Sequence, residues 1–139
     1  MKVKGFAAAA AVAVLPLAAV GCSSQIHDLR PAQRNPAAVG NIKAKADDNK
    51  NTVLEVRAEH LAPPAALDPT LNTYVVWIRP GVAQEFTNVG QLAMRSDRSG
   101  RLQATTPFPE FSVLVTAEQS GTARAPSTFV VMEGYAKRP

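Results

Sequence analysis

The sequence predicts an all-β protein, an antiparallel β-sandwich of about seven strands that follows an N-terminal signal peptide. Three observations support this fold class. In several segments hydrophobic and polar residues alternate with a period of two, which is typical of half-buried strands. Proline, glycine and small polar residues interrupt the 139-residue chain about once every ten residues. After Cys22, no segment shows the 3.6-residue period of an amphipathic helix.

The first 21 residues predict a secretory signal peptide. Lys2 and Lys4 form a basic start, and residues 6–20 are an uncharged, mostly apolar run that only Pro16 interrupts. This run is about 15 residues long, whereas a membrane-spanning helix needs roughly 20. A short basic start followed by a short apolar run and small residues is typical of a cleaved signal. The alternative is a retained membrane anchor, which the short run and the helix-breaking proline disfavour.

Residues 17–22 read LAAVGC and resemble the lipobox of bacterial lipoproteins, although Ala19 stands where leucine is commoner. The resemblance implies that the chain is cut before Cys22, that the Cys22 thiol carries a diacylglyceryl group, and that the amine takes a further acyl chain such as palmitate. Two or more acyl chains hold a protein durably on a membrane, whereas one holds it marginally. The alternative is a stray cysteine within an ordinary signal peptide.

The resemblance also implies a lipid-anchored location in the bacterial cell envelope. Because Ser23, not aspartate, follows the cysteine, a host with two membranes is expected to send the protein to the periplasmic face of its outer membrane. Residues 22–40 are predicted to be the acylated cysteine and a flexible tether, since prolines, a glycine and polar residues leave no sustained period. The alternative is a first strand or short helix docked on the domain through Ile26 and Leu29.

The folded domain is predicted to span residues 41–136. Alternating residues at 41–46 and 54–59, joined by a polar loop, predict a β-hairpin. The proline-rich segment 61–71 is expected to lack regular structure and to cross between two sheets. The remaining strands are expected at 73–79, 88–94, 101–106, 111–118 and 128–135.

The strand 73–79 is expected to be central, because it is apolar on both faces. Its Trp77 matches the position of the buried tryptophan in immunoglobulin-like sandwiches, and the fold class is therefore expected to be immunoglobulin-like or fibronectin-like. The disulfide of antibody domains is excluded because Cys22 is the single cysteine.

A second resemblance runs over about residues 73–132. The segments YVVW at 74–77, NVGQL at 88–92, FSVLVTAE at 111–118 and APS at 125–127 are similar in order to the extracytoplasmic domain of anti-sigma-K-type factors. These motifs are mostly core and turn positions. Those factors carry a sigma-binding region and a spanning helix ahead of this domain, and neither is seen here. The resemblance therefore implies an extracytoplasmic sensing or partner-binding module rather than sigma-factor inhibition.

The charge of the chain argues against a nucleic-acid partner. The full sequence has a net charge of +4, but Lys2 and Lys4 lie in the signal, so that 13 basic and 11 acidic residues remain after cleavage. A mature charge of about +2 is not the footprint of a nucleic-acid-binding domain. The expected partners are the membrane, through the anchor, and an envelope protein or a glycan.

No catalytic, cofactor-binding or metal-binding residues are predicted, and the protein is expected not to be an enzyme. Asp47, Asn49 and Asn51 have the first spacings of a calcium loop, but Thr52 and Ala58 stand where glycine and glutamate are needed, so a polar turn is expected.

Three other segments have weak functional interpretations. His60 is expected to be structural, because no second histidine lies at metal-binding spacing. Phe108 and Phe111 are expected to plug the end of the core rather than to bind a sugar or peptide. The segment 95–101 is expected to be a solvated hairpin tip rather than a basic contact site for headgroups or a partner.

Overall fold

A computed structural model describes residues 5, 9–14 and 23–139 of the chain. The protein is all-β, with nine strands and one short helix in the described part, and it thus confirms the predicted class. The elements, in chain order, are β1 (Ser24–Pro31), β2 (Val39–Ala46), β3 (Thr52–Glu59), α1 (Pro64–Leu67), β4 (Thr73–Arg79), β5 (Thr87–Gln91), β6 (Ala93–Met94), β7 (Gly100–Thr106), β8 (Glu110–Glu118) and β9 (Val130–Lys137).

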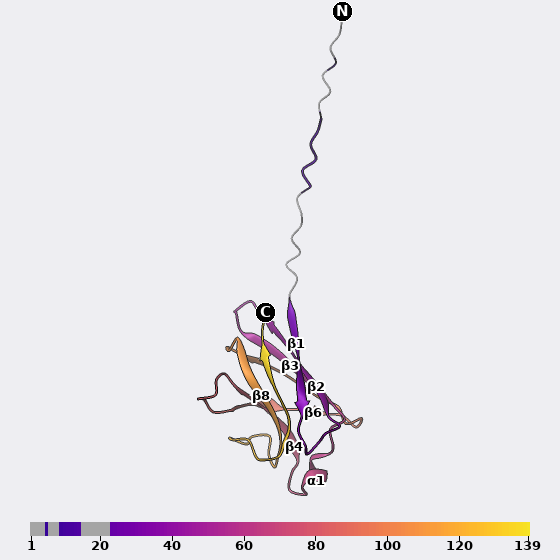
Figure 1. Cartoon of the computed structure of the whole chain (residues 1–139), viewed down its shortest axis with the longest axis vertical. Helices are drawn as coiled ribbons and strands as arrows, with labels where there is room; N and C mark the ends of the chain where they lie inside the picture. Colours follow the sequence, from indigo (N-terminus) through magenta and orange to yellow (C-terminus); the bar gives the residue numbers. More distant parts are fainter. Residues whose placement is uncertain (1–4, 6–8, 15–22) are drawn as a thin grey trace, which may run out of the picture.

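The strands form a single antiparallel sheet in the order β5-β4-β8-β9-β1-β2-β3-β7-β6. β1 joins the two halves of this sheet, because its residues 24–29 pair with β2 while Arg30 and Pro31 pair with β9. The sheet curls around one hydrophobic core and nearly closes, since a side chain at Gly90 of β5 would touch Leu102 of β7. Figure 1 shows the start of β1 beside the C-terminus at one end of the domain, with α1 at the other.

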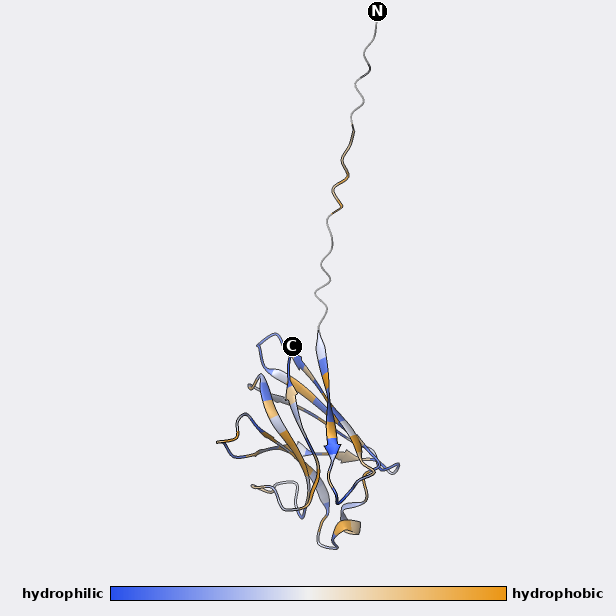
Figure 2. Ribbon diagram, in the orientation of Figure 1, coloured by the Kyte–Doolittle hydropathy of each residue, from blue (hydrophilic) through white to orange (hydrophobic). Residues whose placement is uncertain are grey.

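The hairpin of β2 and β3 confirms the alternation pattern. Ile42, Leu54 and Val56 are fully buried, while the residues between them face solvent. Hydrophobic and hydrophilic residues therefore alternate along the strands in Figure 2. The hairpin turn is a polar one, in which the Asp47 carboxylate accepts hydrogen bonds from the N–H groups of Asn49 and Asn51.

The prediction of a flexible tether is wrong for residues 24–31, which form β1. Leu29 is 4% exposed and packs in the core, whereas Ile26 is 67% exposed, so only one of the two apolar residues docks. His27 binds the carbonyl oxygen of Lys137 through Nε2 at 2.8 Å, which ties β1 to the end of β9. The docked-strand alternative therefore holds, and the strands extend beyond the predicted 41–136 domain at both ends.

Two further predictions differ from the structure. The expected strand 88–94 is split into β5 and β6 at Leu92, whose side chain is buried and whose N–H donates to the Tyr74 carbonyl. The chain thereby passes from pairing with β4 to pairing with β7, which raises the strand count. The proline-rich segment does contain regular structure, because Pro64 begins the four-residue helix α1, where its fixed φ suits the first helical position.

Trp77 is fully buried, as expected, but not in the main core. β4 is covered on both faces: Tyr74, Val76 and Ile78 belong to the core, while Val75 and Trp77 point to the opposite face. Trp77 therefore resembles the tryptophan of immunoglobulin-like sandwiches in its position along the strand. It differs in that its side chain is buried on the face of the sheet opposite the main core.

Candidate functional site

A shallow hollow of about 520 Å³ opens where β3 ends beside the turn between β6 and β7. It unites two features that lie far apart in the sequence, His60 and the basic tip at 95–101. They meet because β3 and β7 are paired along their length, with Ala58 opposite Gly100. The hollow is lined by Arg57, Ala58, Glu59, His60, Arg95, Asp97, Ser99, Gly100 and Arg101.

Local backbone geometry shapes the rim of this hollow. His60, just after β3, and Arg98, in the turn between β6 and β7, both have positive φ angles, of 58° and 64°. The N–H of Leu61 donates to the carbonyl oxygen of Arg98 at 3.1 Å, which ties the two loops together. Asp97 accepts hydrogen bonds from the hydroxyl and the N–H of Ser99, and these bonds lower the pKa of its carboxyl group.

Glu55 holds two of the three arginines that line the hollow. Its carboxylate contacts Arg57 Nε at 2.5 Å and an Arg101 terminal nitrogen at 2.6 Å. Burial by itself raises the pKa of Glu55, but the hydrogen bonds from Arg101 and Arg57 outweigh it, and the pKa lies below its ordinary value. The positive charge of these two arginines is therefore partly compensated within the sheet.

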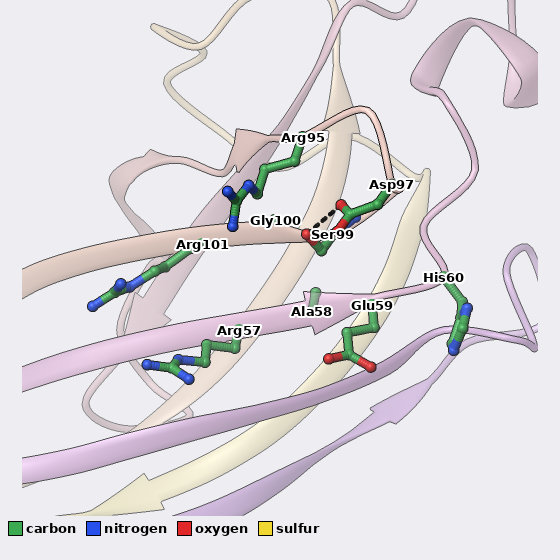
Figure 3. A pocket seen from close by; sticks show the side chains of 9 residues that line it. All are labelled: Arg57, Ala58, Glu59, His60, Arg95, Asp97, Ser99, Gly100 and Arg101. Carbon is green, nitrogen blue, oxygen red and sulfur yellow. Dashed lines mark hydrogen bonds between the residues drawn. The ribbon is translucent and has the colours of Figure 1, made fainter.

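Arg95 is the third arginine, and it forms no ion pair within the described residues. Figure 3 shows the side chains of Arg57, Arg95 and Arg101 extending the same way, with the Glu59 carboxylate below and His60 set apart. Guanidinium groups donate paired hydrogen bonds to carboxylates or phosphates, and Glu59 offers an acceptor. The hollow thus suits a polar ligand with both signs of charge, and the Ser99 hydroxyl on its wall is already bonded to Asp97.

The other residues that the sequence analysis singled out are parts of the core or of local contacts. Phe111 is fully buried and Phe108 packs against the core, which confirms the corner plug. Glu110 and Glu118 do not form an acid–base pair: Glu110 contacts Tyr135 and Lys137, whereas Glu118 accepts a hydrogen bond from the Thr116 hydroxyl.

Cys22, the predicted lipidation site, lies outside the described residues. Among those residues, no group of three or more histidine, cysteine or acidic side chains is arranged to hold a metal ion. In the same part of the chain, none of the helices has the length and apolar character that a membrane crossing requires.

A buried hydrogen-bond chain that the sequence did not reveal lies on the outer face of β4 and β8. Trp77 Nε1 donates to the Thr116 hydroxyl at 2.8 Å, and that hydroxyl donates to the Glu118 carboxylate. The same carboxylate accepts the N–H of Ser127 at 2.7 Å. Asn88, which is opposite Trp77 in the sheet, donates to two carbonyl oxygens of the segment 119–129. These hydrogen bonds hold the segment 119–129 against the face of the sheet on which Trp77 lies.

No family model matches the chain, and no curated protein sequence matches it. The similarity to anti-sigma-K-type factors thus depends on the quoted motifs alone, and it stays a proposal.

Proposed function

We propose that this chain is a lipid-anchored, non-catalytic protein of the bacterial envelope, and that its β-domain binds a partner. The observation that carries the proposal is the position of Cys22. It is the only cysteine, it ends an apolar run with small residues before it, and it stands two residues ahead of the first strand. A folded domain that begins directly after a lipobox-like segment is the arrangement of a lipoprotein.

The test of the anchor is Cys22→Ser in a bacterial host that processes lipoproteins. The unaltered protein is expected to mature with Cys22 as its first residue and with acyl mass attached. It is also expected to stay with the membrane fraction, because two or more acyl chains make membrane release negligible. The variant is expected to remain an unprocessed precursor. If it instead matures normally and still sediments with membranes, acylation is not the anchor.

An edge of the sheet supports the binding of a protein partner. β6 pairs only with Gly100 and Arg101 of β7, so that, within the described part of the chain, residues 102–106 of β7 have no strand hydrogen-bonded on that side. Such an edge can accept an added strand from another chain. A glycan is the second partner class, and Tyr135, which is 51% exposed, is a side chain on which a sugar ring can stack.

Substitutions in β7 test the edge. In an antiparallel strand, successive N–H groups point to opposite sides. Gln103→Pro and Ala104→Pro therefore have different effects. One of the two substitutions removes a backbone hydrogen bond to β3, and the other removes only an N–H group at the open edge of β7. The variant that keeps full stability is expected to lose a protein partner in a pull-down from envelopes, and retention of every partner would count against the edge.

An alternative function is an extracytoplasmic sensing or regulatory domain related to anti-sigma factors. Trp77, Thr116, Glu118 and Ser127, all within or beside the motifs that carry that resemblance, form one buried hydrogen-bond chain. Deletion of the gene is then expected to change a defined set of transcripts, and Glu118→Gln is expected to reproduce part of that change. A transcript profile unaffected by deletion would argue for the binding module.

We also propose that the curled sheet is an immunoglobulin-like or fibronectin-like sandwich rather than a closed barrel. The support is that its two halves share only β1 and that the chain changes halves at Leu92. In a sandwich the edges of β5 and β7 remain unpaired. Hydrogen exchange is therefore expected to be fast for the N–H groups of β7 that face away from β3, and strong protection of these groups would favour a barrel.

A further inference from the structure

The anchor leaves the domain little freedom of position. This inference depends on the proposed acylation of Cys22, from which two residues of extended chain reach Ser24 over about 7 Å. Ser24 is already paired with Lys45 of β2, and the pairing continues without a break to Leu29. β1 is also tied to β9 by His27 and Lys137. The start of β1 must therefore lie at the surface of the membrane that holds the acyl chains.

The sheet face beside Ser24 carries lysines and an exposed apolar side chain. Directly paired residues of neighbouring antiparallel strands project to the same face. Ser24 pairs with Lys45 and Ile26 pairs with Lys43, so these four side chains lie together on the outer face of β1 and β2. Both lysines are exposed, and Ile26 is 67% exposed.

These lysines have no acidic partner in the described part of the chain. They border a second hollow, of about 160 Å³, with Val53, Glu55 and Gln103. Glu55 does not serve as their counterion, because its two oxygens contact Arg57 and Arg101. The hollow therefore presents two ammonium groups without an ion-pair partner among the described residues. Lys45 lies opposite Ser24 and Lys43 opposite Ile26, two and four residues after Cys22.

We propose that this anchor-side face, formed by Ser24, Ile26, Lys43 and Lys45, lies against the anionic lipid headgroups of the membrane that holds Cys22. Lysine ammonium groups beside a bilayer are attracted to anionic headgroups, and a neighbouring apolar side chain gains by leaving water. The arginine-lined hollow at Glu59 is about 20 Å further along β3 from Val53. It lies on the same outer face of the sheet, because Val53, Glu55, Arg57 and Glu59 alternate along one side of β3, and it is the part of that face farther from the anchor.

Site-specific labelling of the full lipidated protein tests this orientation. Acylation occupies the only native cysteine, so an introduced cysteine takes a fluorophore at one place. Gln103→Cys reports from the anchor-side hollow, and Glu133→Cys reports from β9 on the other half of the sheet. The vesicles contain three parts phosphatidylcholine to one part phosphatidylglycerol, with a nitroxide quencher on a fraction of the headgroups.

The label at 103 is expected to be quenched several-fold more than the label at 133. Lys43→Glu with Lys45→Glu is expected to remove most of that difference, as are vesicles of phosphatidylcholine alone. The matched control is Arg98→Glu with Arg124→Glu, two exposed residues away from this face, which makes the same charge change and is expected to leave the difference intact.

Mass spectrometry of the same samples separates the two levels of the proposal. If Cys22 carries no acyl groups and the protein stays in solution, the proposed anchor fails and the orientation fails with it. If Cys22 is acylated and the protein is bound, but the two labels are quenched equally or the label at 133 more strongly, only the orientation is overturned. Circular dichroism confirms that each variant keeps its strand content.

Discussion

Replacing Trp77 by alanine is expected to be severely destabilising, although the ring is not part of the main core. The side chain is fully buried on the outer face of β4, and its Nε1 donates to Thr116. Asn88, its partner in the sheet, donates to two carbonyl oxygens of the segment 119–129, which places this segment over the ring. Removing a buried tryptophan costs about 3–5 kcal/mol. About 1 kcal/mol of this loss belongs to the hydrogen bond. Trp77→Phe, which keeps most of the apolar volume, is therefore expected to cost roughly 1–2 kcal/mol.

Far-UV circular dichroism measures the unfolding of both variants, because the substitution removes the only tryptophan and with it the tryptophan fluorescence. For a domain of this size, 1 kcal/mol corresponds to about 4 °C in Tm, so Trp77→Ala is expected to lower the Tm by roughly 12–20 °C. The free energy of unfolding follows from urea titrations if the transition is two-state.

Limited trypsin digestion tests the local part of the argument. With the ring removed, the segment 119–129 loses its support, and cleavage after the exposed Arg124 is expected to become faster under native conditions. Val76→Ala is the matched control, since it weakens the opposite face of β4 and is expected not to accelerate this cleavage. A Tm within about 4 °C of the unaltered protein would show that the ring is not held under this segment.

Three further predictions concern β1, a close approach and a buried hydroxyl. Leu29→Ala is expected to cost about 2–4 kcal/mol in urea unfolding, whereas Ile26→Ala, on the same strand but exposed, is expected to leave stability unchanged; equal effects would contradict the docking of β1. Gly40→Ala places a Cβ 2.3 Å from Met132 Cε and 3.0 Å from a backbone oxygen, so a loss of about 1–3 kcal/mol is expected, and a Tm equal to that of the unaltered protein would refute this close packing. Burial raises the pKa of Tyr74 to about 12. Since tyrosine in the unfolded chain ionises near 10, the contribution of Tyr74 to stability is fully present below pH 10 and is lost as the pH rises toward 12. Urea midpoints measured across that range are expected to fall more steeply than those of Tyr74→Phe, and parallel slopes would argue against the raised pKa.

The strands with a regular alternation were predictable, and those with a single buried residue were not. β4 has the predicted bounds, because it is a continuous apolar run that ends at Arg79. β2, β3, β7 and β8 lie within two residues of their predicted bounds, because hydrophobic and polar residues alternate along most of their length. β1 buries only Leu29, so it has no periodic signal, and Pro31 pointed to a loop. Its pairing with β2 and β9 is a long-range interaction that local propensity does not encode.

The candidate sites show the same division. His60 and the tip at 95–101 were singled out separately, but their meeting depends on the β3–β7 register. The pairing of Glu55 with Arg57 and Arg101 likewise joins residues up to 46 positions apart. For the anchor-side face, the sequence showed only that Lys43 and Lys45 share one side of a strand. The pairing of β1 with β2 then placed Ile26 beside them.

By itself, the sequence determined the all-β class, most strand positions and the lipobox-like segment that ends at Cys22, because side-chain periodicity and local spacing are properties of neighbouring residues. Only the tertiary structure decided that β1 joins the two halves of the sheet, that Trp77 is buried under a distant segment, and which charged side chains share a face. These features arise from hydrogen bonds and packing between residues far apart in the chain, and no local pattern specifies them.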